Sequence, residues 1–245
     1  MEVASDAPLI VGIDTSTKGG SCALMRGEEC LGEVTLAPRP HSETLVPALE
    51  FLLGQVGLRP ADADAFAVAG GPGAFTGLRI GVTTAKGLAV ANRKPLVVVP
   101  TLEALAVPLR GRGPWVATVL DARRGEVWAS LWRVAGVVLE EVEGPIGIKP
   151  AEWAAMVGDR AEGAPVLFVG DGVALCRAAA ESADKMRYRE ASPWDHRIRA
   201  SVVARLGGER LLAGRVDDPA AAAPVYLRSQ AGVFEPRSER EEKVG

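Results

Sequence analysis

Residues 70–81 read GGPGAFTGLRIG, and this stretch joins a strained turn to the start of a helix with one nearly bare face. The apolar run AFAVA at 65–69 comes before it and is typical of a buried strand. Glycines on both sides of Pro72 suit backbone angles with positive φ, so we expect the strand to end here in a turn. The hydroxyl of Thr76 is then placed to cap the next helix. The stretch therefore predicts a strand, a turn and a helix in direct succession.

The predicted helix, from about 76 to 91, carries Gly77, Gly81 and Ala85 at a spacing of four residues. Interaxial distance depends on the side chains at the contact, so a stripe of small residues lets a second helix approach to roughly 8 Å. The sequence leaves open whether that neighbour belongs to this chain or to a partner. We expect a partner, and predict that Gly77, Gly81 and Ala85 contact it.

A second helix is expected over about 44–56, with Leu45, Leu49 and Leu52 along one face. An amphipathic stripe of this kind usually packs on the chain's own sheet. Val46, Phe51 and Leu53, however, make this helix apolar nearly all round, and such helices are normally covered on more than one side. We therefore predict that Leu45, Leu49 and Leu52 also belong to a partner-binding surface.

Composition argues for an ordinary globular protein and against several classes. The 245 residues are 48% hydrophobic and 24% charged, with a net charge of −3, so the total charge gives no sign of nucleic-acid binding. Three cysteines without CxxC spacing indicate neither a disulfide framework nor a zinc knuckle and fit a reducing cytoplasm. The first residues form no basic leader, and no apolar run approaches about 18 residues. We expect a cytoplasmic chain with no signal and no membrane segment.

The chain repeats one pattern of elements. Three strands, a helix, a strand and a helix are expected first over 8–91 and again from 115 onwards. In both halves an apolar strand ends in aspartate, at Asp14 and at Asp121. A duplicated α/β architecture of two lobes is the simplest account. We place an N-terminal lobe with the partner-binding helices at 1–110, a C-terminal lobe at 111–230 and a flexible charged tail at 231–245.

The best candidates for chemistry lie at the ends of the first strands of the two halves. Asp14, Thr15 and Ser16 offer a carboxylate and two hydroxyls at a strand-to-hairpin turn, a combination that can hold phosphate and Mg²⁺. With Asp121 across a cleft, they would suit an Mg-dependent ATPase or kinase. The other interpretation is that both aspartates only accept hydrogen bonds from turn amides. The chain has no GxxxxGK[ST] motif, and 170–172 reads GDG, whose aspartate would sit badly beside a phosphate.

A metal site and a peptidase site are both disfavoured by the sequence. His41 would need a second histidine four residues on, and that position is Leu45. His41 is therefore expected to be a surface residue that forms a hydrogen bond where its helix begins. Neither GxSxG nor HExxH occurs in the chain. We predict no catalytic and no metal-binding residue.

Several segments together resemble one known family. They are IVGIDTSTKGGSCAL at 10–24, HSETLVPALEFLL at 41–53, AVAGGPGAFTGLRIGVTTAKGLA at 67–89 and DARRGEVW at 121–128, followed more thinly by FVGDG at 168–172 and PVYLR at 224–228. They are similar to bacterial TsaB (YeaZ), a family of tRNA threonylcarbamoyladenosine biosynthesis. The resemblance implies an actin-like ATPase fold of the sugar kinase and Hsp70 superfamily, which agrees with the duplicated lobes.

The resemblance also implies a function. Members of this family are non-catalytic paralogues of TsaD. TsaD transfers the threonylcarbamoyl group to the adenosine beside the anticodon of tRNA. The two predicted helices correspond to the surface through which family members contact TsaD or a second copy of themselves. TsaD carries HxxxH where this chain has His41 and Leu45. The resemblance implies no intrinsic cofactor, with ATP or ADP and Mg²⁺ at the interface of the complex. TsaE joins the assembly, and tRNA is expected to be contacted indirectly, through the complex.

Overall fold

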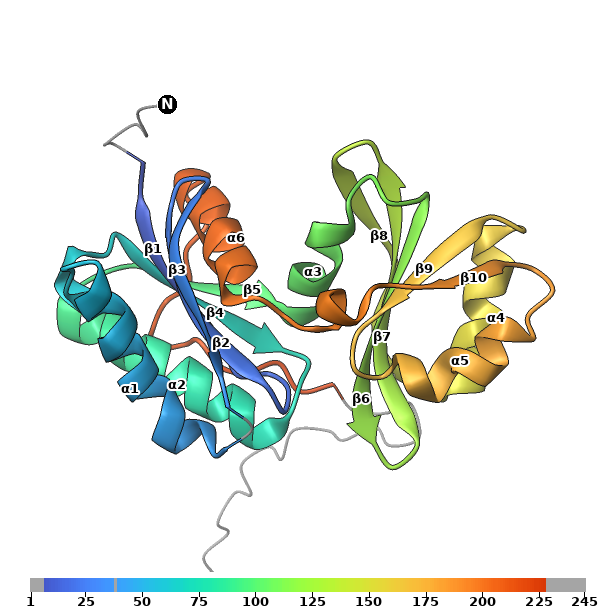
Figure 1. Ribbon diagram of the computed structural model, residues 1–245, viewed down its shortest axis with the longest axis horizontal. Helices are drawn as coiled ribbons and strands as arrows, with labels where there is room; N and C mark the ends of the chain where they lie inside the picture. The colour runs from blue at the N-terminus through green and yellow to red at the C-terminus, as the bar shows by residue number, and fades with distance from the viewer. Residues whose placement is uncertain (1–6, 38, 228–245) are drawn as a thin grey trace, which may run out of the picture.

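The chain folds into two five-stranded sheets with the same strand order. The computed structural model describes residues 7–37 and 39–227. The first sheet has the order β3-β2-β1-β4-β5, and the second has the equivalent order β8-β7-β6-β9-β10 (Figure 1). The strands of the first sheet are β1 (Leu9–Asp14), β2 (Gly20–Arg26), β3 (Glu29–Leu36), β4 (Ala65–Gly71) and β5 (Leu96–Pro100). Those of the second are β6 (Trp115–Arg123), β7 (Glu126–Ala135), β8 (Val138–Ile148), β9 (Pro165–Val169) and β10 (Arg187–Glu190).

Strand pairing repeats as well. In each sheet the first three strands form an antiparallel meander, and the fourth and fifth strands add in parallel to the first. Asp14 ends β1 opposite Ser21, and Asp121 lies near the end of β6 opposite Val127. The two aspartates therefore occupy equivalent places in the two sheets. The predicted duplicated α/β architecture is confirmed.

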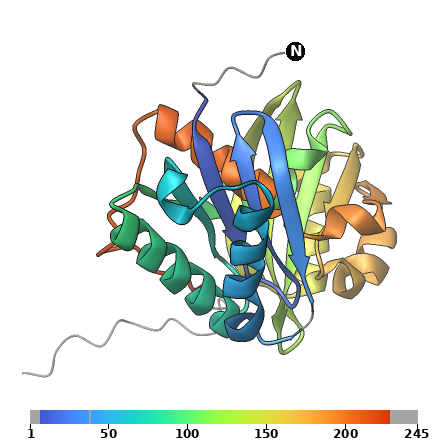
Figure 2. The same ribbon diagram turned by 60° about the vertical axis from the view of Figure 1, so that its left-hand side comes forward.

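Helices cover both sheets, and two of them lie between the sheets. Figure 1 and Figure 2 show α1 (His41–Gln55) and α2 (Phe75–Asn92) side by side on the outer face of the first sheet. The outer face of the second sheet carries α4 (Pro150–Ala161) and α5 (Val173–Glu181). Between the sheets lie α3 (Thr101–Ala106) and α6 (Ala200–Leu212). The described residues also form three short 3-10 helices: η1 (Pro60–Asp62), η2 (Val107–Leu109) and η3 (Pro193–His196).

Three hydrophobic cores follow from this layering. A central core joins the inner faces of both sheets and includes Ile10, Leu105, Val116 and Leu206. A core between the first sheet, α1 and α2 and a core between the second sheet, α4 and α5 flank it. The two lobes are therefore held together by a shared apolar layer as well as by the linking chain.

Helix α6 comes from the C-terminal half but packs on the first sheet, against β1, β4 and β2. The approach is close, because a Cβ on Gly12 would meet Ala204 Cβ at 2.8 Å and a Cβ on Gly207 would collide with Ala67. The division at residues 110 and 111 stays a prediction, but within the predicted lobe 111–230 this one helix belongs by its contacts to the first lobe. The predicted tail at 231–245 lies outside the described residues.

Some predicted boundaries were wrong. Helix α1 begins at His41, three residues before the expected start. Helix α2 begins at Phe75 after an Ala74 cap, so Thr76 lies within the first turn and does not cap the helix. Strand β10 and helix η3 were not expected from the sequence. Within the described residues, no helix has both the length and the apolar character that a membrane span requires.

The segment after α6 returns along the first lobe and ends against the second. The Asp217 N–H donates to the carbonyl of Leu96 at 2.8 Å, and the Val225 N–H donates to the carbonyl of Gly70 at 2.7 Å. Further on, the Trp128 indole of the second lobe donates to the carbonyl of Leu227 at 3.2 Å. Residues 215–227 therefore form a strap that links the two lobes.

Candidate functional site

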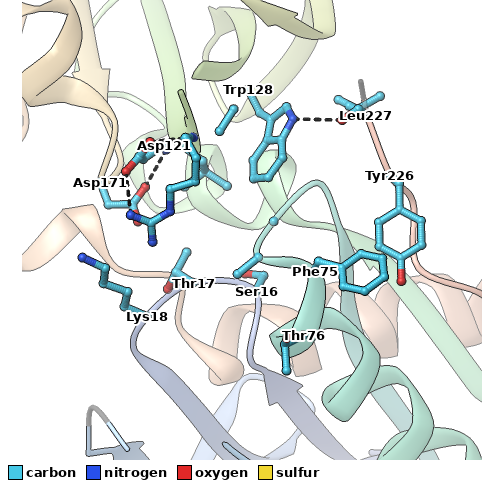
Figure 3. Close-up of a pocket in the computed structure, with 15 residues that line it drawn as sticks. Ser16, Thr17, Lys18, Phe75, Thr76, Asp121, Trp128, Asp171, Tyr226 and Leu227 are labelled. Atoms are coloured by element: carbon cyan, nitrogen blue, oxygen red, sulfur yellow. Dashed lines mark hydrogen bonds and ion pairs between the residues drawn. The ribbon is translucent and has the colours of Figure 1, made fainter. Parts of the chain in front are cut away.

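A cavity of about 500 Å³ lies between the lobes, at the ends of β1 and β6. Figure 3 shows its walls. The first lobe supplies the turn 16–18 and residues 73–76, and the second supplies 120–123, Trp128 and Asp171. Tyr226 and Leu227 of the strap complete the lining. The turns that the sequence analysis singled out therefore do face one another across a cavity.

Asp14 is buried behind the cavity wall. Its side chain is 1% exposed, and its Oδ1 accepts hydrogen bonds from the Ser16 N–H at 3.0 Å and from the Ser16 hydroxyl at 2.6 Å. Its Oδ2 is buried without a hydrogen-bond partner in the described residues. Burial raises the pKa of Asp14 from its ordinary value of 3.8 to about 6, against the opposing effect of the Ser16 hydrogen bonds.

The other predicted residues divide between the wall and the interior. Ser16 and Asp121 line the cavity. Thr15 is 1% exposed, and its hydroxyl donates to the carbonyl of Gly77 at 2.7 Å, so it fixes β1 to α2. Of the four residues predicted for a nucleotide site, two therefore face the cavity and two serve the packing beneath it.

The second-lobe wall is acidic. Asp121 accepts hydrogen bonds from the Arg123 N–H at 2.8 Å and from the Arg123 guanidinium at 3.1 Å. Asp171 accepts a hydrogen bond from the Asp121 N–H at 3.0 Å, and burial raises the pKa of Asp171 above its ordinary value. Lys18 faces these groups from the first lobe (Figure 3).

This lining fits a nucleotide with Mg²⁺ poorly. Phosphates in the cavity would meet the carboxylates of Asp121 and Asp171, while the Arg123 guanidinium is already paired with Asp121. The spare oxygen of Asp14 is enclosed by protein. The part of the chain described by the structure contains no group of three His, Cys, Asp or Glu side chains arranged to hold a metal.

His41 is part of the packing at the start of α1. Its Nε2 lies 3.1 Å from the carbonyl oxygen of Thr17, and the residue is 8% exposed rather than on the surface as expected. Leu45, one turn further on, is 1% exposed in the core beneath α1. The position four residues after His41 thus holds a core side chain.

The six residues predicted to contact a partner are all buried within this chain. Leu45, Leu49, Leu52 and Ala85 are at most 4% exposed in the core under α1 and α2. A Cβ on Gly77 would collide with the carbonyl of Thr15, and one on Gly81 with the Thr15 hydroxyl. The small-residue stripe does admit a close neighbour, but that neighbour is the end of β1. In the free chain these residues face the chain's own sheet, and their contact with a partner stays a prediction.

The opposite side of the same helices is open. Val46 and Phe51 on α1 are 47% and 60% exposed, and Val90 on α2 is 64% exposed. Nothing lies within 4 Å of a Cβ placed on Gly87 of α2. We call Val46, Phe51, Gly87 and Val90 the outer helix face. Val46 and Phe51 were expected from the sequence, whereas Leu53, expected with them, is 6% exposed in the core under α1. Gly87 and Val90 were not expected, although helical periodicity places both away from the Gly77 and Gly81 side.

Comparison with known proteins identifies the family. A family model described as "TsaD: tRNA N6-adenosine threonylcarbamoyltransferase" matches residues 35–231. The tRNA threonylcarbamoyladenosine biosynthesis protein TsaB of Bacillus subtilis is 34% identical over 220 residues, which span 89% of this chain and 93% of that protein. The chain belongs to the TsaB family.

Other TsaB proteins agree with this assignment. TsaB of Escherichia coli is 34% identical over 149 residues, which span 58% of this chain and 62% of that protein. The solved structure of YeaZ from Pseudomonas aeruginosa matches with a TM-score of 0.75 at 26% identity, covering 90% of this chain and 100% of that one. The resemblance stated from the sequence motifs is confirmed, and with it a place in tRNA threonylcarbamoyladenosine biosynthesis.

Proposed function

We propose that this chain is a non-catalytic subunit that binds and activates TsaD, with the outer helix face as its contact. The exposure of Val46, Phe51 and Val90 on two adjacent helices supports the proposal. Apolar side chains gathered on one exposed surface are typical of a protein interface. The open surface at Gly87 adds room for a partner helix to approach the backbone of α2.

The packing of His41 and Leu45 supports the non-catalytic part of the proposal. The resemblance places the HxxxH metal ligands of TsaD at these two positions. In this chain Leu45 is a core residue, and the ring of His41 lies against the carbonyl of Thr17. A metal-binding side chain at position 45 would have to point out of the core, and a cavity would then remain beneath α1. Both positions are therefore used for folding.

The rest of the proposed assembly is supported by the resemblance to the TsaB family. We propose that two copies pair through the outer helix face when TsaD is absent, and that TsaD displaces one of them. TsaE, and ATP or ADP with Mg²⁺, then act at the interface of the complex. The cytoplasm is the compartment proposed for all of these steps.

The test compares single arginine substitutions on the two lobes. Val46→Arg and Gly87→Arg place a long charged side chain on the outer helix face, where space is open in the free chain. Val138→Arg is the matched control, because Val138 is 59% exposed on the second lobe. Light scattering and titration calorimetry with TsaD of the same organism measure the mass and affinity of the complex.

We expect Val46→Arg and Gly87→Arg each to weaken TsaD binding at least ten-fold, because a buried unpaired charge at an interface costs more than about 1.4 kcal/mol. Val138→Arg should bind like the parent chain. All three should unfold at the temperature of the parent within a few degrees. If both outer-face variants bind TsaD as tightly as the control, the outer helix face is not the contact.

An active Mg-dependent ATPase or kinase is the second candidate. The meeting of the turns at 16–18 and 121–123 around one cavity favours it. The acidic second-lobe wall weighs against it. Thermal unfolding of the isolated chain with ATP and Mg²⁺ and a phosphate-release assay decide between the two, since an enzyme would be stabilised and would release phosphate without TsaD.

A further inference from the structure

An arginine-rich surface follows the chain segment that runs from the edge strand β10 of the second sheet to the start of α6 on the first sheet. None of its residues lines the cavity or belongs to the outer helix face. It consists of Arg112, Arg187, Arg189, Arg197, Arg199 and Trp194, all of which are exposed. We propose that this arginine surface binds RNA directly, with the guanidinium groups on backbone phosphates and Trp194 stacked on an unpaired base. The proposal departs from the expectation that tRNA is contacted only through the complex.

Three neighbouring segments build the surface. Strand β10, at the edge of the second sheet, alternates its side chains, so Arg187 and Arg189 lie on the face opposite Tyr188. The ring centroids of Tyr188 and Phe168 lie 5.2 Å apart, so Tyr188 is on the face of the second sheet that α4 and α5 cover. Short helix η3 follows β10 and carries Trp194, and the chain then continues through Arg197 and Arg199 to α6 (Figure 1).

The loop at 110–113 joins this surface through an ion pair. The Arg112 Nη1 lies 2.6 Å from the Asp195 Oδ2 of η3, and the Asp195 side chain is only 9% exposed. This pair fixes the RGRG loop beside the helix that presents Trp194. A Cβ placed on Gly111 or Gly113 would have nothing within 4 Å, so the loop backbone is open to a ligand.

The charge on the surface is not neutralised locally. Residues 186–199 hold four arginines and two acidic residues. Both acidic side chains are already paired: Glu190 with Arg177 at 2.8 Å and Asp195 with Arg112. Within the residues that the structure describes, Arg187, Arg189, Arg197 and Arg199 form no salt bridge. A chain with a net charge of −3 therefore concentrates free positive charge on one surface.

The kinds of residue favour RNA over an acidic protein. Arginine binds phosphate in a bidentate way and stacks on bases, which lysine does not. All the basic residues named for this surface are arginines. Trp194 is 78% exposed, although tryptophan is among the residues that bury the most area. Basic grooves with exposed aromatic rings are typical of single-stranded RNA binding. The biosynthesis in which the family takes part modifies tRNA, which offers both phosphates and unpaired loop bases.

The experiment measures fluorescence anisotropy of a labelled tRNA transcript with the full chain, from 50 to 200 mM salt. The variants are Arg189→Gln/Arg197→Gln and Trp194→Ala. The charge-matched control is Arg59→Gln/Arg133→Gln, because both of these arginines lie outside the surface and are largely exposed. A parallel titration uses polyglutamate of equal charge in place of RNA. None of these measurements requires TsaD, so they are independent of the function proposed above.

We expect affinity for tRNA to fall as salt rises, because bound phosphates release counterions. The double arginine variant should lower the slope of log affinity against log salt by about 1–2. Trp194→Ala should weaken binding about ten-fold and leave that slope unchanged. The control should match the parent. Repeating the measurement with the TsaD complex should show the same order of variants.

Two results would overturn the proposal. Equal tRNA affinity of the double arginine variant and its charge-matched control would show that binding follows net charge and not this surface. Binding of polyglutamate as tight as that of tRNA, with no effect of Trp194→Ala, would assign the surface to an acidic protein. Failure of Val46→Arg to disturb TsaD binding would leave this proposal unaffected, because the two surfaces share no residue.

Discussion

Two glycines of α2 give opposite predictions for the same substitution. Alanine is favoured over glycine in a helix interior by about 1 kcal/mol, so Gly→Ala is stabilising wherever space allows. At Gly87 nothing lies within 4 Å of the added carbon. At Gly81 the carbon would collide with the Thr15 hydroxyl and lie 3.5 Å from Val68 Cγ2. Opposite changes in stability would therefore show that Gly81 lies on the packed side of α2 and Gly87 on the open side.

The size of the stability change in Gly81→Ala follows from the hydrogen bond that Thr15 would lose. To make room for a methyl group at position 81, Thr15 must turn and lose its 2.7 Å hydrogen bond to the carbonyl of Gly77. A buried polar group left without a partner costs about 1–3 kcal/mol, and overpacking costs about 1–3 kcal/mol more. After the gain in helix propensity, Gly81→Ala should lower the free energy of unfolding by about 1–5 kcal/mol. Gly87→Ala should raise it by about 0.5–1 kcal/mol.

Urea unfolding followed by circular dichroism measures both changes, at two protein concentrations ten-fold apart. An internal contact gives a loss of stability that does not depend on concentration, because no second chain takes part. If Gly81→Ala were as stable as Gly87→Ala, the stripe would not pack on β1. A loss that appears only at the higher concentration would return the stripe to an interface between copies.

Two further predictions concern Asp14 and the strap. The pKa of Asp14 is raised in the folded chain from 3.8 to about 6, so the stability present at low pH is lost as pH rises through about 6. The side chain of Asp14→Asn cannot ionise. In urea unfolding at pH 4.5–8, the free energy of unfolding of this variant should exceed that of the parent chain by an amount that grows with pH towards about 3 kcal/mol. A difference that stays constant with pH would contradict the burial argument. Tyr226→Ala removes a ring 5.0 Å from Phe75 and a 3.1 Å hydrogen bond from Arg79, and should cost about 1 kcal/mol. Tyr226→Phe keeps the ring and should cost less in the same assay; equal costs would mean that the stacking contributes nothing.

Sequence reasoning predicted the fold well because each sheet follows a local pattern. Alternating apolar runs and glycine turns mark the strands of both halves, and the repeat of this pattern indicates duplication without any knowledge of long-range contacts. The short strand β10 was missed because RYRE holds one aromatic residue among three charged ones. Its place beside β9 depends on backbone pairing and on the packing of Tyr188 on Phe168.

The candidate site was harder to predict because it depends on the direction in which each helix face and side chain points. Helical spacing showed that Gly77, Gly81 and Ala85 share one face, but not which way that face points. The structure turns it towards Thr15, a residue more than sixty positions earlier. Likewise, the sequence placed Asp14 and Asp121 at equivalent strand ends, but burial of the first and exposure of the second to the cavity depend on how the lobes close.

The position of α6 sets the order in which the chain can fold during synthesis. Residues 1–110 leave the ribosome long before residues 200–212, yet the inner face of their sheet, with Ile10 and Ala67, is covered by that late helix. The inner face of the first sheet therefore stays exposed until residues 200–212 have been made. Contacts this distant in sequence slow folding and leave intermediates open to aggregation. Dependence on chaperones during translation is the expected consequence of covering the first sheet with a helix from the C-terminal half.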